Sequence, residues 1–110
     1  MQTVAEMPTF IKQADKLFSP EERVSVINFI SAYAELGDII KGTGGVRKLR
    51  VPAKGKGKSG GARIILYYLD ENAPIYALMI YPKDAKISLS AKEKKIVSSL
   101  AKALKTAHRR

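Results

Sequence analysis

Apolar and polar residues recur along the chain with two different periods, which predict an order of helices and strands. Residues 3–7 alternate weakly and predict a first strand. Helical spacing follows at residues 8–17 and again, over a longer stretch, from Pro20 toward Gly37. Period two predicts further strands at residues 46–51, 62–69 and 75–81, and helical spacing returns after residue 90.

The starts of the two longer helices carry the same capping signal. Ser19 and Ser90 each precede a predicted helix, and a glutamate follows each of them three residues later. Such a pair can satisfy the backbone N–H groups of both residues, so we expect helices to begin there. Gly37 is expected to end the first of these helices. The core positions expected in the second are Ile96, Val97, Leu100, Ala101 and Leu104.

This element order predicts an α+β fold. A chain of 110 residues fits one domain with a modest core, so residues 1–110 are expected to form a single domain. The three late strands follow one another as a meander, which favours an antiparallel twisted sheet joined by the N-terminal strand. We expect the two N-terminal helices and the C-terminal helix to pack on one side of this sheet.

Composition excludes several kinds of site. The chain has no cysteine and one histidine, His108, which excludes disulfides, thiolate metal sites and a metal site built from several histidines. No metal or cofactor is expected. No apolar run approaches the ~20 residues of a membrane span, and residues 1–10 lack the pattern of a signal peptide. The expected location is therefore the cytoplasm.

Positive charge is concentrated in two parts of the chain. The net charge is +10, yet residues 1–40 carry three basic and six acidic side chains. Residues 41–63 hold eight Lys or Arg, no acid and seven of the eight glycines. An anionic polymer is the natural partner, with RNA or DNA ahead of a membrane surface. A merely solvated basic surface is the simpler alternative.

Four cations stand where the predicted strands meet. Lys48 and Arg50 share one face of a strand, Arg63 begins the next strand, and Lys83 ends the last. Neighbouring strands would bring these side chains to one end of the sheet. Clustered cations stabilise the extra charge of a phosphorane-like transition state, and a lysine among cations can accept a proton near neutral pH. RNA supplies its own 2′-hydroxyl, so cleavage needs neither histidine nor metal; binding without cleavage is an equal alternative.

Further side chains are candidates for RNA contact. Tyr67 shares the face of Arg63 and is the preferred residue for stacking a base, with Tyr81 second. Arg47 points with Leu49 to the other face and is expected to reach solvent at the strand end. Lys54, Lys56 and Lys58 lie in a glycine-rich loop, whose simpler role is a solvated hairpin connection.

Two blocks of this region resemble a known family. GTGGVRKLRV and GKGKSGGARII, within a stretch of roughly residues 36–100, are similar to the HigB branch of the RelE/ParE toxin superfamily. The resemblance implies a RelE-like fold and the toxin of a type II toxin–antitoxin pair. Such toxins enter the ribosomal A site and cut translated mRNA by attack of the 2′-hydroxyl, which inhibits translation. A HigA-like helix-turn-helix antitoxin is the implied partner.

The resemblance also implies roles for individual residues. Lys48 matches a family lysine thought to be the base, and Arg50 stands where a second lysine stabilises charge. Arg63 matches the family arginine after the glycine loop, and Lys83 stands where an arginine assists the leaving group. Leu89 replaces a base-stacking tyrosine. Arg47, Lys54, Lys56 and Lys58 would contact RNA, the last three on the ribosome.

Two functions from other classes remain open at this point. One is a ParE-like gyrase inhibitor without nuclease action, and the other is a non-catalytic RNA-binding module. The central basic loop favours the nuclease, because toxins that resemble ParE generally lack this set of cations.

Overall fold

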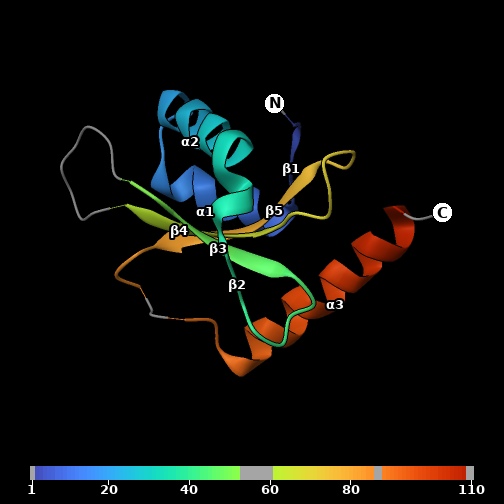
Figure 1. Ribbon diagram of the computed structural model, residues 1–110. Helices are drawn as coiled ribbons and strands as arrows, with labels where there is room; N and C mark the ends of the chain where they lie inside the picture. The colour runs from blue at the N-terminus through green and yellow to red at the C-terminus, as the bar shows by residue number, and fades with distance from the viewer. Residues whose placement is uncertain (1, 53–60, 86–87, 109–110) are drawn as a thin grey trace.

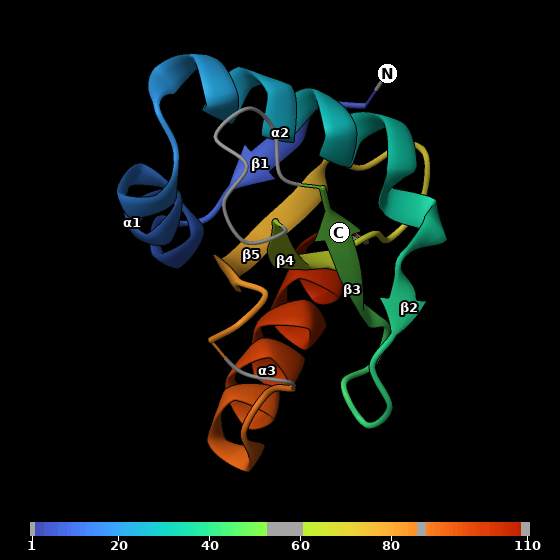
Figure 2. The same ribbon diagram turned by 90° about the vertical axis from the view of Figure 1, so that its left-hand side faces the viewer.

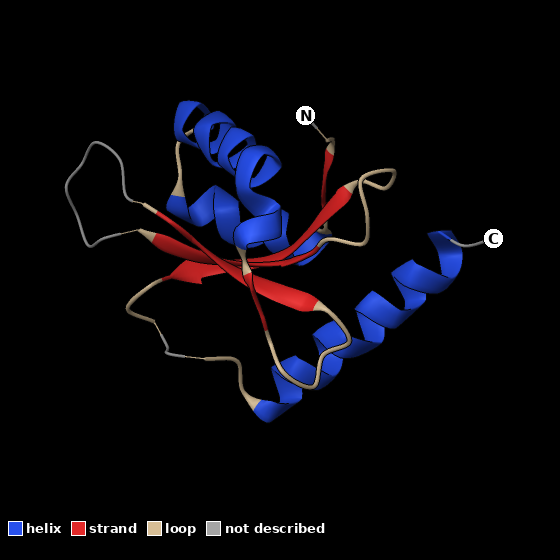
Figure 3. Cartoon of the chain, in the orientation of Figure 1, coloured by secondary structure: helices blue, strands red, loops and turns tan. Residues whose placement is uncertain are grey.

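The computed structural model describes residues 2–52, 61–85 and 88–108. They form a five-stranded sheet in the order β1-β5-β4-β3-β2, with helices on both faces (Figures 1 and 3). The elements in chain order are β1 (Val4–Glu6), α1 (Pro8–Leu17), α2 (Pro20–Tyr33), the 3-10 helix η1 (Ala34–Leu36), β2 (Asp38–Ile39), β3 (Val46–Val51), β4 (Ala62–Tyr67), β5 (Ile75–Pro82) and α3 (Ala91–His108). The predicted α+β class is confirmed.

Both predicted capping boxes are present at the helix starts. The Glu22 N–H donates to Ser19 Oγ at 3.2 Å, and the Ser19 N–H donates to Glu22 Oε1 at 2.8 Å. Ser90 and Glu93 make the same pair of bonds before α3, at 3.1 and 2.9 Å. Each box satisfies two N–H groups that a helix N-terminus leaves without partners.

The helices cover opposite faces of the sheet, which differs from the expectation that all pack on one side. α1 and α2 bury a cluster around Phe10, Ile30 and Ile64 on the first face. α3 buries a second cluster around Val46, Ile65 and Val97 on the other (Figure 2). The central strands are consequently apolar on both faces, as β4 shows with five of its six residues buried. Alternation along such a strand carries no information about which face is covered.

The ends of the sheet also differ from the prediction. β1 pairs with β5 in parallel, with Val4 opposite Ile75. α1 and α2 follow β1 in the chain, and the meander of β3, β4 and β5 then begins at the opposite side of the sheet and ends beside β1. β2 was not expected, since two residues carry no recognisable period. The helix predicted to reach Gly37 ends as an α-helix at Tyr33, and η1 completes the last turn.

A glycine-rich turn joins β2 to β3 and sets their register. Thr43 is fully buried there, and its Oγ1 donates to the Ile40 carbonyl at 2.6 Å and accepts from the Val46 N–H at 3.1 Å. Gly42 and Gly44 on either side have φ of 81° and 74°, a region that L side chains rarely adopt. The turn thereby fixes the register that places Asp38 opposite Lys48.

Fewer residues of α3 are buried against the sheet than the sequence predicted. Val97 and Ala101 are buried, whereas Ile96, one of the expected core positions, is 56% exposed. Leu100 and Leu104 pack at the border of the cluster. Within the described ranges, no helix is long and apolar enough to cross a membrane.

Candidate nucleic-acid interface

The strand register brings three of the four predicted cations to one face of the sheet. Arg50 on β3 is directly opposite Arg63 on β4, which is in turn opposite Tyr81 on β5. Lys48 is two residues before Arg50 and therefore shares its face. This is the face that α3 covers, since Ile65 and Tyr81 of the same side belong to the α3 cluster. The predicted gathering of Lys48, Arg50 and Arg63 on one face is thus seen in the pairing of the strands.

Lys83 lies at the same end of the sheet, one residue after β5. Its backbone N–H donates to the Gly61 carbonyl at 3.1 Å, which continues the β4–β5 pairing beyond Ala62 and Pro82. Lys83 is half-buried and starts a turn. We refer to Lys48, Arg50, Arg63 and Lys83 together as the cation row.

Repulsion between the positive charges of the cation row destabilises the folded protein. Like charges directly opposite one another on adjacent strands destabilise a sheet. Neither Arg50 nor Arg63 forms an ion pair with an acid in the described ranges, where the ion pairs are those of Arg23 and His108. The Nε of Arg63 is buried and has no hydrogen-bond partner among the same residues. A surface anion is the kind of ligand that such an arrangement accommodates.

The two tyrosines predicted to stack bases are core residues. Tyr67 shares the face of Arg63, as expected, but it is 3% exposed and lies under α3 against Tyr76, with ring centroids 6.5 Å apart. Tyr81 is 5% exposed, and Leu89 packs in the same cluster. Neither tyrosine ring presents a face to solvent in this conformation, so we remove both from the base-stacking set. The cause is α3, which covers a face that the sequence pattern left open.

Arg47 lies on the predicted face of the sheet, opposite to the cation row. Its side chain is half-buried on the side of α2. One Nη donates to the Glu35 carbonyl at the end of η1, and the guanidinium lies 5.5 Å from the Tyr68 ring centroid. Burial, and then the nearby Glu35 carboxylate, raise the pKa of that tyrosine. Arg47 therefore fastens η1 to the sheet, and we withdraw it from the RNA-contacting set.

Replacing Arg47 distinguishes a role in holding η1 to the sheet from a role in RNA contact. We expect Arg47→Ala to lower the free energy of unfolding by about 1–2 kcal/mol, because a cation–π contact and a hydrogen bond are lost together. Any activity of the folded protein toward RNA is expected to stay within about twofold of its native level. Urea titration and an RNA assay below the unfolding transition measure the two quantities. A large loss of that activity at unchanged stability would return Arg47 to the site.

The remaining predicted contacts, Lys54, Lys56 and Lys58, lie outside the described residues. Sequence reasoning did not single out Asp38, which stands opposite Lys48 in the register of β2 and β3. No signal for it exists in a strand of two residues.

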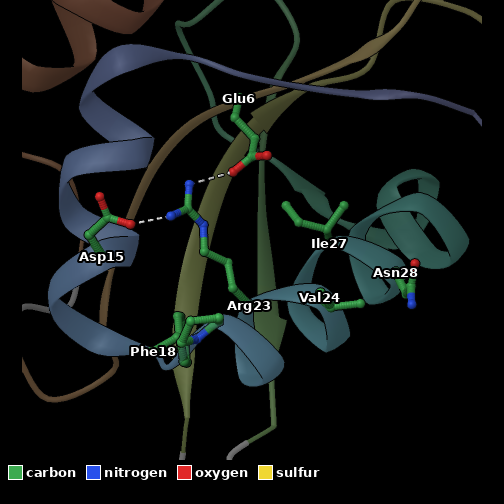
Figure 4. Close-up of a pocket in the computed structure, with 8 residues that line it drawn as sticks. Glu6, Asp15, Phe18, Arg23, Val24, Ile27 and Asn28 are labelled. Carbon is green, nitrogen blue, oxygen red and sulfur yellow. Dashed lines mark hydrogen bonds and ion pairs between the residues drawn. The ribbon is translucent and has the colours of Figure 1, made fainter.

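A groove lies on the other side of the molecule, between β1, α1 and α2 (Figure 4). It has a volume of about 530 Å³ and apolar walls that include Phe18, Val24 and Ile27. Arg23 bridges Glu6, at 2.8 Å, and Asp15 across its floor. The hydrogen bond to Glu6 raises the pKa of Arg23, so this arginine stays charged and committed to the two carboxylates. The ion pairs of Arg23 thus join α1, α2 and β1, and the groove is separate from the cation row.

A row of cations on one face of a sheet is typical of the class of proteins that bind a phosphate polymer. The family of the chain is in accord with this class. A family model described as the RelE toxin of the RelE / RelB toxin–antitoxin system matches residues 10–110. The chain belongs to the RelE toxin family, and it is a toxin whose family implies an antitoxin partner. The superfamily named from the two glycine-rich blocks is confirmed.

Proposed function

We propose that this toxin is a ribosome-dependent mRNA endonuclease of the HigB branch, which cuts translated mRNA in the ribosomal A site and so inhibits translation. The family supports a toxin, and RelE toxins are generally ribonucleases. The observation that carries the finer proposal is the cation row. Its two central arginines, Arg50 and Arg63, are directly opposite each other on β3 and β4, so their charges repel. Binding of a phosphate between them would remove this repulsion.

In the proposed reaction the RNA provides the nucleophile. The 2′-hydroxyl oxygen forms a bond to the adjacent phosphorus, and the bond from phosphorus to the 5′-oxygen of the next nucleotide breaks. Lys48 takes the proton of the 2′-hydroxyl, and Lys83 assists the leaving 5′-oxygen, which gains a proton. The products are a 2′,3′-cyclic phosphate and a 5′-hydroxyl, so no water is consumed. These two roles follow the family resemblance of the residues.

Arg50 and Arg63 would act on the phosphate itself. Charge builds up on the non-bridging oxygens as the fifth bond to phosphorus forms, and guanidinium groups fixed on neighbouring strands stabilise it without reorganising. Paired strands hold both arginines on rigid elements, which keeps the attacking oxygen in line with the leaving oxygen. Lys54, Lys56 and Lys58 would contact the ribosomal RNA backbone, and a HigA-like helix-turn-helix antitoxin would block the row.

Cleavage mapping tests this function against its two rivals. The native protein is added to a purified translation system, and primer extension on the translated mRNA locates new 5′ ends. We expect cuts only when ribosomes translate the message. DNA-damage signalling in cells without mRNA cuts would instead indicate gyrase inhibition. Salt-sensitive RNA binding without cuts or growth arrest would indicate a binding module.

A further inference from the structure

α2 carries apolar side chains on two of its sides, and the sheet covers only one of them. Val26 and Ile30 are buried against the sheet, whereas Val24 is 61% exposed and lines the groove together with Ile27 (Figure 4). The wall that α2 gives to the groove runs from Pro20 to Asn28, which is about 12 Å or two helical turns. Apolar residues on two sides of a helix indicate that both sides are covered.

The floor of this groove is negatively charged. Glu6 and Asp15 lie on it, and both of their carboxylates bind the guanidinium of Arg23. Two carboxylates and one guanidinium leave a net charge of −1. The surrounding chain has the same sign, since residues 1–40 carry six acidic and three basic side chains. The groove therefore suits an occupant that is apolar and positively charged.

α3 presents this chemistry on its outer side. Ile96 is 56% exposed, and Lys92, Lys95 and Ser99 are exposed around it. Residues three and four apart share one side of a helix, so these four side chains form one stripe. Val97, on another side of the helix, faces the sheet. We call Lys92, Lys95, Ile96 and Ser99 the basic stripe.

We propose that the basic stripe of one copy of this chain seats in the groove of another copy. Ile96 would pack between Val24 and Phe18, and Lys95 would bring its ammonium group to the carboxylates of the groove floor. An amphipathic helix laid in an apolar groove is a common mode of protein recognition. Residues 92–99 span about 10 Å, which matches the length of the groove along α2.

The distribution of charge selects a second copy as the occupant. Residues 83–110 carry nine basic and two acidic side chains, the reverse of the acidic excess in residues 1–40. α1 and α2 lie on one face of the sheet and α3 on the other (Figures 1 and 2). The net charge of +10 repels other copies at long range, but salt at about 0.15 M screens exposed charges beyond about 8 Å. The attraction between groove and stripe acts at contact and is screened less.

The opposite placement of groove and stripe makes this contact head to tail. A copy that inserts its basic stripe into a neighbour keeps its own groove open for a third copy. Such heterologous contacts produce rings or open chains rather than closed dimers. The contact covers two turns of one helix, less than a stable dimer needs, so we expect a Kd on the order of 100 µM. The mean mass in solution should therefore rise steadily with concentration.

Sedimentation of two blocked variants tests the proposal. All proteins carry Arg63→Ala, which keeps RNA cleavage out of the measurement. Ile96→Glu blocks the stripe and leaves the groove intact, and Val24→Glu does the reverse. Each variant alone should stay monomeric at about 300 µM, where the Arg63→Ala parent associates. An equal mixture should form 1:1 complexes that grow no further, because only the groove of Ile96→Glu and the stripe of Val24→Glu can pair.

Leu36→Glu is the matched control, since Leu36 is 73% exposed on η1 and belongs to neither surface. It adds the same charge and should associate as the parent does. Circular dichroism melts verify folding, and Val24→Ser with Ile96→Ser is the milder pair for the same mixing experiment.

The other outcomes would overturn the proposal. A parent that is still monomeric at about 1 mM removes the contact. A mass that levels off at a dimer, or loss of association in Leu36→Glu, assigns self-association to another surface. A mixture of folded variants that stays monomeric rejects the pairing of groove with stripe. Because no RNA enters the measurement, its result is independent of the proposed function.

Discussion

Arg63→Ala is expected to lower the rate of mRNA cleavage by about 100- to 1,000-fold, the loss seen when one fixed donor to a developing charge is removed. Arg63 is the central member of the cation row, with Arg50 opposite it on β3 and Tyr81 opposite it on β5. Its Nε has no hydrogen-bond partner among the described residues, so alanine breaks no hydrogen bond of that atom within this part of the chain. Single-turnover cleavage on programmed ribosomes measures the loss, and growth arrest should disappear with it.

Arg47→Ala is the matched control for this substitution. It removes the same side chain from the neighbouring strand, but on the opposite face, where the guanidinium contacts Tyr68 and η1. The control should lose stability and keep its cleavage rate, whereas Arg63→Ala should do the reverse. Undiminished cleavage by Arg63→Ala would reject the assigned site.

Arg50→Glu is expected to abolish cleavage and to make the protein more stable. The native pair of arginines places like charges opposite each other, and glutamate would convert it into a pair of opposite charges. Such cross-strand pairs contribute several tenths of a kcal/mol, so the free energy of unfolding should rise by about 0.5 kcal/mol. The glutamate also neutralises Arg63 and repels phosphate. Urea titration and single-turnover cleavage report the two opposite changes.

Arg50→Gln separates charge from shape at the same position. It removes the repulsion without adding attraction, so its stability should lie between that of the native protein and Arg50→Glu. A loss of stability in both variants would show that Arg50 supports the fold. The cation row would then not be a destabilising feature that is kept for function.

Local signals were sufficient for most elements of this fold. Ser19 and Ser90 predicted two helix starts because a capping box is made by residues three apart. Residues 46–51 predicted β3 with its bounds intact. The same period placed Lys48 and Arg50 on one face and Arg47 on the other, as the register confirms. These features depend on residues that are close together in the sequence, so the sequence alone is enough to predict them.

Features set by distant contacts could not be predicted in this way. The parallel pairing of β1 with β5 joins Val4 to Ile75, and nothing near either residue encodes it. Tyr67 was expected at the surface because alternation does not reveal that α3 covers its face. The contact of Arg47 with the Glu35 carbonyl was not predicted, because that carbonyl belongs to an unpredicted turn of 3-10 helix. In each case tertiary packing decided what the local pattern left open.

In the proposed reaction the cation row directs the 2′-hydroxyl of RNA onto its own phosphate. The most direct measurement compares two mRNAs on programmed ribosomes, one all-ribose and one with a single 2′-deoxynucleotide before the scissile phosphate. We expect native toxin to cut the first and to leave the second intact at that position. Equal cleavage of both messages, or cleavage of neither, would show that the 2′-hydroxyl is not the nucleophile of this protein.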